Sequence, residues 1–185
     1  EGALKNLDAE TQGKEFDCIV AEADTAWEDA LGVIDVQGDA DQMAMFYTSL
    51  YHTMINPSVY MDVDGSYRGL DHNIHKADGF TNYTVFSLWD TYRALMPLYN
   101  IIDRKGSRDM AMSMLAHYDQ SVHHILPVWS HCANENWCMI GYPGVSVLAA
   151  AIAKGIDIDK EKAMEAMVSS ATLPYYGGTA EYMKL

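Results

Sequence analysis

The sequence predicts an all-α fold with one or two short β-hairpins. Hydrophobic residues make up 49% of the 185 residues, enough for a sizeable core. In six segments they recur at the spacing of one helix face, and Gly, Pro or capping residues mark the segment ends. Helical spacing is lost over residues 57–86, where turn signals indicate hairpins. No repeat, linker or change of composition divides the chain, so residues 1–185 are expected to form a single unit.

The first two predicted helices precede this stretch. Apolar residues recur through residues 16–34 with acids between them, which is typical of an amphipathic helix, and Trp27 is expected in its buried face. After a break at Gly38, a second apolar stripe runs through residues 43–54 and ends before Pro57. The short connection indicates that the two helices are antiparallel.

Residues 57–86 are expected to carry binding groups, because a non-helical excursion of this length inside a compact domain is usually functional. Residues 60–62 and Tyr67 are predicted to form a small hairpin around an Asp64-Gly65 turn. Residues 81–86 are predicted to form another short strand.

Three acids in this segment are candidate binding residues: Asp62, Asp64 and Asp71. An EF-hand is excluded, because Gly65 comes two positions too early and Asn73 stands where the loop needs a bidentate Glu. The alternative is that these aspartates only form turns.

Ser87 is expected to begin the next helix, with Asp90 reaching back as a short capping box. Trp89, Asp90 and Arg93 lie near its opening turn, where a planar ring, an acceptor and a fork of donors could bind a sugar together. Capping is the alternative role for Asp90. The buried stripe of this helix is predicted to comprise Leu88, Leu95, Leu98 and Ile102.

Three further helices complete the pattern. Ser107 is expected to cap a helix that runs to about residue 122. Pro143 suits the first position of the next helix, and Gly155 suits its C-terminal end. Asp159 is expected to cap the last helix, which Pro174 closes. The six helices are therefore predicted to form antiparallel pairs, joined by short turns and long loops.

The net charge of −14 argues against a nucleic acid or an anionic membrane as partner, because phosphate binding needs clustered Lys and Arg. No run of eighteen apolar residues is present. A neutral sugar is compatible with this composition.

The three cysteines, Cys18, Cys132 and Cys138, cannot complete a disulfide framework and are expected to be buried thiols. His131 beside Cys132 suggests zinc superficially. The C-x5-C spacing is not that of a usual zinc motif, so zinc is a minor alternative.

The richest stretch chemically is residues 131–142, with Glu135 as its only carboxylate. Beside Trp129, Trp137 and Met139 this carboxyl is expected to be partly desolvated, which raises its pKa and suits a glycosidase acid. A nearby helix N-terminus at Pro143 would lower the pKa, and the sequence does not decide which effect prevails. The alternative is an exposed Glu in a polar turn, with Trp137 in the core.

Several motifs resemble one family closely. They are N-E-N-W-C-M-I-G-Y at residues 134–142, Y-M-D-V-D-G-S-Y-R-G-L-D at 60–71, F-S-L-W-D-T-Y-R-A-L-M-P-L at 86–98 and L-P-V-W at 126–129. The sequence resembles the catalytic domain of the family 92 glycoside hydrolases, calcium-dependent exo-acting α-mannosidases, over its whole length. Asn136 and Pro143 depart from the family pattern, which has Thr and His there.

The resemblance implies roughly half of an (α/α)6 toroid and an inverting hydrolysis of terminal mannose, with α-1,2 linkages expected. It implies Glu135 as general acid and a substrate cavity lined by the W-D-T-Y-R run. The expected substrate-binding residues are Trp89, Asp90, Arg93, Asp64, Asp71 and Trp137.

The resemblance places the base and most calcium ligands beyond Leu185, so no metal ligand is assigned and the chain alone is expected to be inactive. The implied partners are a mannose-containing oligosaccharide or glycoprotein glycan and the remainder of the catalytic domain. The implied location is secreted, periplasmic or at the cell surface. The alternative function is a non-catalytic helical carbohydrate-binding or scaffold domain.

Overall fold

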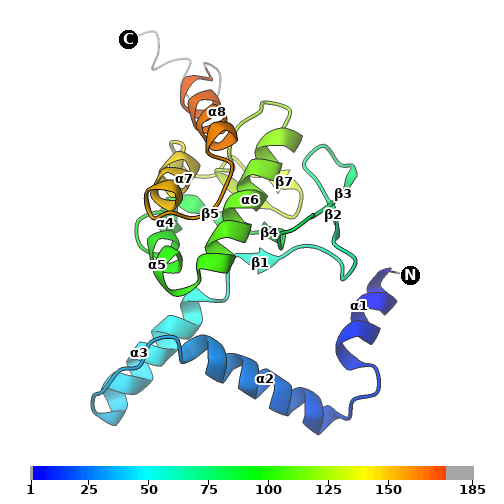
Figure 1. The fold of residues 1–185 in the computed structure, drawn as a ribbon, viewed down its shortest axis with the longest axis vertical. Helices are drawn as coiled ribbons and strands as arrows, with labels where there is room; N and C mark the ends of the chain where they lie inside the picture. The colour runs from blue at the N-terminus through cyan, green and yellow to red at the C-terminus, as the bar shows by residue number, and fades with distance from the viewer. Residues whose placement is uncertain (1, 174–185) are drawn as a thin grey trace. The chain divides into compact units, whose positions relative to one another are not determined.

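The computed structural model describes residues 2–173, and these are mostly helical with a few short strands, which confirms the predicted class. The helices are α1 (Gly2–Thr11), α2 (Phe16–Leu31), α3 (Ala40–Thr53), α4 (Leu88–Thr91), α5 (Leu95–Ile102), α6 (Arg104–Gln120), α7 (Pro143–Ala153) and α8 (Lys160–Thr172) (Figure 1). The strands are β1 (Ser58–Val59), β2 (Ser66–Arg68), β3 (Ile74–Lys76), β4 (Tyr83–Thr84), β5 (Phe86–Ser87), β6 (Trp129–His131) and β7 (Asn134–Glu135). None of the helices in this range combines the length and apolar character needed to cross a bilayer.

Contacts group the chain into two compact units. The first comprises Glu1–Asn56 with Asp62–Asp64, and the second comprises Pro57–Met61 with Gly65–Leu185. The single unit expected from the sequence stays a prediction. The partial toroid also stays a prediction.

The first unit contains α1, α2 and α3. Asp39 begins α3 with a full capping box: its carboxylate accepts the Gln42 N–H at 2.9 Å, and the Gln42 side chain accepts the Asp39 N–H at 3.3 Å. Helix α1, which the sequence reading missed, holds the returning chain, because the Asn6 amide donates to Asp62 at 2.7 Å. Asp62 is therefore bound within this unit.

The predicted burial of α2 is wrong. No residue of this helix is buried, and Trp27 is 39% exposed even though its ring lies 4.7 Å from that of Tyr51 on α3. One partner helix can cover only part of an apolar stripe, so the rest of this face stays in contact with solvent.

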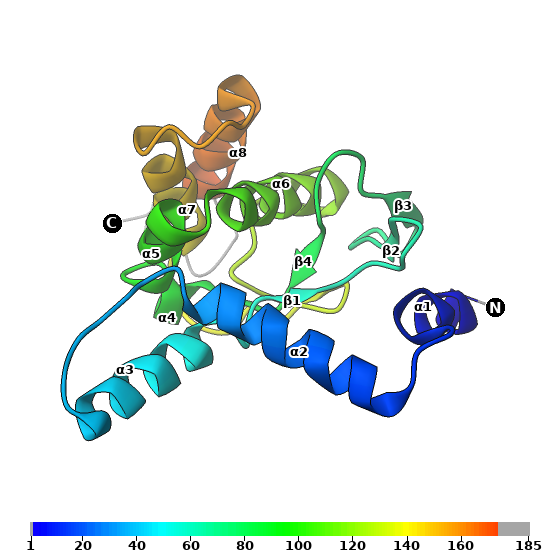
Figure 2. The same cartoon turned by 60° about the horizontal axis from the view of Figure 1, so that its bottom comes forward.

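The second unit is built around α6, which packs against α5, α7 and α8. Figures 1 and 2 show α7 and α8 on one side of α6 and the β2–β3 hairpin on the other. Arg104 at the start of α6 donates to the carbonyls of Lys154 and Gly155 at the end of α7, the latter at 2.8 Å. The core comprises mainly Phe86, Leu88, Met110, Met114, Leu115, Leu148, Ala151, Ala163 and Ala166.

Several predicted helix ends are confirmed. Pro143 opens α7, Gly155 follows its end with φ +72°, and Asp159 caps α8 by accepting the Lys162 N–H at 3.0 Å. Ser107 does not cap α6. Asp103 does, through the Gly106 N–H at 2.8 Å, while the Ser107 hydroxyl lies inside the helix and donates to Asn100.

The helix predicted from Ser87 to Ile102 is split into α4 and α5. Pro97 explains the break, because its ring would clash with the carbonyl four residues earlier in a continuous helix. The second helix restarts at Leu95, which places Pro97 in a first turn, where its missing N–H costs nothing.

The predicted hairpin partners in residues 57–86 are partly wrong. Strand β1 pairs with β4, Ser58 opposite Thr84, and β2 pairs with β3, Tyr67 opposite His75. The Asp64-Gly65 turn precedes β2 and does not close a hairpin. The predicted buried thiols are also wrong, since Cys18, Cys132 and Cys138 are all exposed.

Candidate active site

A three-stranded sheet in the order β5-β6-β7 positions the candidate residues. All pairs are antiparallel, with Ser87 opposite Trp129 and Ser130 opposite Glu135. The sheet therefore places the start of α4, just after β5, beside the strand that leads to Glu135.

A tight turn joins β6 to β7. Its two residues, Cys132 and Ala133, both have positive φ, 45° and 61°, as a two-residue hairpin turn of type I′ requires. Gly and Asn usually fill such positions, so this turn is strained. The Cys132 N–H donates to the Thr84 hydroxyl at 2.8 Å, which ties the turn to β4.

The turn folds the Glu135 side chain back onto the main chain. Its Oε1 accepts the N–H groups of Trp129 at 2.9 Å and Trp137 at 3.1 Å, and its Oε2 accepts that of Val128 at 3.0 Å. The side chain is only 6% exposed, so the alternative of an exposed Glu135 is wrong. Burial raises the pKa of Glu135, and the N–H donors counteract part of that rise.

Two of the three side chains expected to desolvate Glu135 are largely exposed. Trp137 is 45% exposed and Met139 is 47% exposed, so these side chains do not enclose the carboxyl. The side chain of His117, in the last turn of α6, faces the Glu135 carboxyl, and its Nε2 lies 3.6 Å from Oε2.

His117 is buried, with a side chain 7% exposed, and its Nε2 has no hydrogen-bond partner in the described part of the chain. Burial lowers the pKa of His117 to about 3, so the ring is neutral at ordinary pH. The pKa shifts of His117 and Glu135 both favour uncharged forms. The pair is therefore a neutral imidazole facing a carboxyl group that holds its proton more tightly than usual, and not an ion pair.

Glu135 borders a cavity of about 190 Å³. This volume is below the roughly 300 to 1,000 Å³ of drug-sized sites and suits a ligand about the size of one sugar ring. The indole of Trp137 lines it and lies 5.9 Å from the His123 ring. The lining residues are Leu70, His72, His117, Ser121, Val122, His123, Ala133, Asn134, Glu135 and Trp137.

The structure thus brings together Glu135 and Trp137, two of the residues predicted for the site. Sequence reasoning missed His117, His72 and His123, because isolated histidines are more often ordinary surface or core residues. The structure also shows backbone strain that the sequence does not signal: Trp137 and Met139 have φ of 55° and 73°, and such strain clusters at functional sites.

Trp89, Asp90 and Arg93 do not line this cavity. The Arg93 guanidinium covers the Trp89 ring at 4.6 Å and also lies 5.2 Å from the Tyr92 ring. The predicted capping box of Ser87 is wrong, because its hydroxyl donates instead to the Asp90 carboxylate at 2.5 Å. Sugar contact by these three residues stays a prediction.

Asp71 does not line the Glu135 cavity either. Its carboxylate accepts the Asn73 side-chain amide at 2.9 Å and lies 2.9 Å from the His75 Nε2. These hydrogen bonds, with Asn73 the larger contributor, lower the pKa of Asp71 to about 2. This geometry favours the turn-forming alternative. Asp64 is exposed and belongs to the other compact unit.

Residues 2–173 contain no group of three or more His, Cys, Asp or Glu arranged to hold a metal ion. The acids considered as binding residues have other partners, as Asp62 and Asp71 illustrate.

The sequence of residues 2–185 matches the glycosyl hydrolase family 92 catalytic domain. No curated protein matches the chain. The solved family GH92 α-mannosidase BT3965 from Bacteroides thetaiotaomicron is 49% identical over 98% of this chain, with a TM-score of 0.94. The inverting mannosidase BT2199 from B. thetaiotaomicron VPI-5482 is 31% identical over the full chain, with a TM-score of 0.87.

The chain spans about a quarter of each of these solved relatives, 24% of BT3965 and 26% of BT2199. BT3965 has also been solved in complex with mannoimidazole. The match to the family domain covers nearly every residue, and the identity to BT3965 is high over the same length. The chain therefore belongs to glycosyl hydrolase family 92.

Proposed function

We propose that this chain supplies the general acid of an inverting exo-α-mannosidase, and that Glu135 is that acid. The observation that carries the proposal is a buried carboxyl, fixed by three backbone N–H groups, at the wall of a cavity that suits one sugar ring. Burial raises its pKa, as a carboxyl needs if it is to arrive protonated and donate at neutral pH.

The hydrogen bonds indicate which oxygen carries the proton. Oε1 accepts the N–H groups of Trp129 and Trp137, and Oε2 accepts that of Val128. A protonated carboxyl has one carbonyl oxygen and one hydroxyl, and the oxygen with two donors suits the carbonyl role. Oε2 therefore carries the proton that passes to the leaving oxygen as the glycosidic bond breaks.

An inverting reaction also needs a base that activates water on the opposite face of the sugar, about 6.5 to 9.5 Å from the acid. We assign that base to sequence outside residues 1–185. Trp137, which lines the cavity, is proposed to contact the sugar ring. Trp89, Asp90, Arg93, Asp64 and Asp71 remain proposed substrate contacts in the complete protein.

The substrate class is proposed from the relatives. BT2199 is described as an inverting mannosidase, and BT3965 as an α-mannosidase solved with mannoimidazole. We propose that the substrate is a terminal mannose of a mannose-rich oligosaccharide or glycoprotein glycan, with α-1,2 linkages preferred and N-glycan degradation as the role. The proposed location is secreted, periplasmic or cell-surface, which fractionation of the source cells would test.

Calcium is proposed as the cofactor of the complete enzyme because of family membership. Its ligands are assigned mostly to sequence outside this chain, because the described acids do not form a site. When bound, such an ion would organise the sugar hydroxyls. Removal of calcium from the complete protein by a chelator should abolish hydrolysis without changing the hydrogen bonds that hold Glu135.

The alternative function is a carbohydrate-binding or scaffold domain without catalysis. A binding module has no need for a desolvated proton donor, and an ordinary or depressed pKa for Glu135 would favour it. The raised pKa of Glu135 supports the enzyme instead.

The test is Glu135→Gln in the complete protein. We expect hydrolysis of α-1,2-mannobiose to fall by about 10²- to 10⁴-fold, with little change in substrate binding. The leaving oxygen of an aryl mannoside with a strongly acidic phenol hardly needs protonation. The variant should therefore retain far more of its activity on that substrate. Equal losses on both substrates would contradict the acid role. Intact hydrolysis of mannobiose would mean that residues 131–142 have only a structural role.

A further inference from the structure

His117 is a buried polar group that the proposed chemistry has not used. Its Nε2 lies 3.6 Å from Glu135 Oε2, and it has no hydrogen-bond partner within the described residues. Leaving such a nitrogen unpaired costs roughly 1 to 3 kcal/mol. A cost of this size indicates that Nε2 forms a hydrogen bond in another state of the site, such as the one with substrate bound.

The geometry identifies the partner of Nε2 as Glu135 Oε2, the oxygen proposed to carry the proton. Oε2 accepts one N–H where Oε1 accepts two, so it has room for a further donor once its proton has left. The present separation exceeds hydrogen-bond distance by about 0.5 Å. Catalytic hydrogen bonds are often long before substrate binds and shorten in the reacting complex.

On the basis of the proposed role of Glu135, we propose that His117 is a positioning residue. Its Nε2–H donates a hydrogen bond to Glu135 Oε2 as that oxygen gives up its proton. The opposite tautomer would present a lone pair to Oε2. It would compete with the glycosidic oxygen for the proton and then repel the carboxylate. A donor at Nε2 fits both states and is strongest after transfer, so it assists the transition state more than the ground state.

Several other titratable groups lie around His117 and Glu135. His72 and His123 line the same cavity. Tyr60, Tyr67, Tyr83 and Arg68 are among the residues that line a second, small cavity of about 30 Å³, which His117 also borders. Burial raises the pKa of each of these three tyrosines above 10, so they stay neutral across the working range. The contribution of His72 and His123 is tested below by replacing both with Gln.

The experiment compares His117→Leu with His117→Gln in the complete protein, because the Gln amide retains a donor near the position of Nε2. We expect His117→Leu to lower kcat on α-1,2-mannobiose by about 10- to 100-fold, the worth of a hydrogen bond to a charged group. On 2,4-dinitrophenyl α-mannoside the loss should stay below about 3-fold, because that leaving group needs no proton.

The pH profile of kcat distinguishes a hydrogen-bond donor from a residue that only fills space, because loss of packing alone would not shift the pKa of Glu135. Loss of a donor to the carboxylate makes Glu135 a weaker acid, so the alkaline limb of kcat should move up by about one pH unit or more. His117→Gln should restore both the rate and the limb. The upward move should persist when His72→Gln and His123→Gln are present together.

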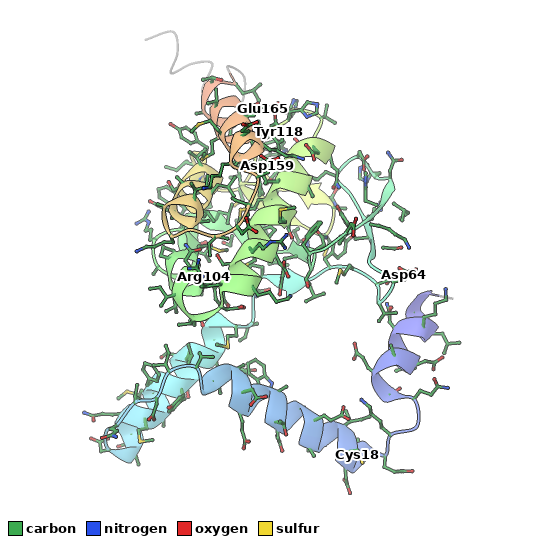
Figure 3. All side chains as sticks on the ribbon, viewed as in Figure 1. Cys18, Asp64, Arg104, Tyr118, Asp159 and Glu165 are labelled. Atoms are coloured by element: carbon green, nitrogen blue, oxygen red, sulfur yellow. The ribbon has the colours of Figure 1, made fainter. Side chains whose placement is uncertain are left out.

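Tyr118→Phe is the matched control for damage to α6. Tyr118 is the next residue along the helix, is also buried, and donates to Glu165 of α8 at 3.0 Å, away from the cavity (Figure 3). This variant should lose stability while its alkaline limb stays in place.

A loss that is equal on the two substrates, a limb that stays or moves down, or a failure of Gln to rescue would each overturn the donor role of His117. If Glu135→Gln shows the dependence on leaving group and His117→Leu does not, only this inference fails. If Glu135→Gln lacks that dependence, the proposed function fails first.

Discussion

Acidification should loosen α6 through His117. The pKa of this side chain is lowered from 6.5 to about 3 because burial penalises the imidazolium form. The folded pKa therefore lies below the unfolded one. The stabilising contribution is fully present above pH 6.5 and is lost as the pH falls from 6.5 toward 3.

The magnitude follows from the slope of 1.36 kcal/mol per pH unit for one proton. At pH 6.5 half of the unfolded imidazole is already protonated, so between pH 6.5 and pH 5 the local opening free energy should fall by roughly 1.6 kcal/mol, about a 16-fold rise in the open population. Glu135 acts in the opposite direction. Its raised pKa favours the folded state below the unfolded value near 4.5, and that contribution is lost as the pH rises through the folded value.

Hydrogen exchange of the α6 amides in the complete protein measures this opening locally, and the Ser121 N–H bonded to the His117 carbonyl at 2.9 Å is a suitable probe. His117→Gln should remove the acid-dependent part, whereas His131→Gln, at an exposed histidine of β6, should leave it in place. An unchanged pH dependence in His117→Gln would refute the argument. It would mean that folding does not lower the pKa of His117.

Two further predictions concern local structure. Asp159→Ala should destabilise α8 by about 1 kcal/mol in thermal unfolding because it removes the cap on the Lys162 N–H, and no change would mean that the cap is dispensable. Ala133→Gly should stabilise the β6–β7 turn by about 0.5 to 1 kcal/mol because φ is +61° there, and Ala133→Val should destabilise it; the reverse order in denaturant titrations would contradict the assigned turn.

Local signals in the sequence predicted local structure well. Pro143, Gly155 and Asp159 act through their own dihedrals or side chains, so their helix ends were confirmed. Pairing between distant strands has no such local signal. The partner of Ser58 is Thr84, and no nearby residue indicates that choice. The break before Leu95 was readable from Pro97 but was outweighed by the apolar spacing around it.

The candidate site was predictable only where its chemistry is contiguous. Glu135 and Trp137 belong to one stretch, and the structure places both at one cavity. His117 comes from α6, and only the packing of that helix against the hairpin brings it to Glu135. Asp71 lies between Leu70 and His72, which line the cavity, yet its own side chain turns to Asn73 and His75. Side-chain direction in a loop is a tertiary property that residue type does not encode.

The carboxyl of Glu135 is held by peptide groups of Val128, Trp129 and Trp137 and not by their side chains. Replacing the Trp137 indole, which lines the cavity, would therefore reshape the cavity while the carboxyl kept its position. An insertion or deletion in the Cys132-Ala133 turn would instead move the carboxyl, because it would change which peptide N–H groups donate to it. For the proposed function, this separation means that glycan selectivity can be varied at Trp137 independently of proton donation by Glu135, while the length of this hairpin has to be preserved.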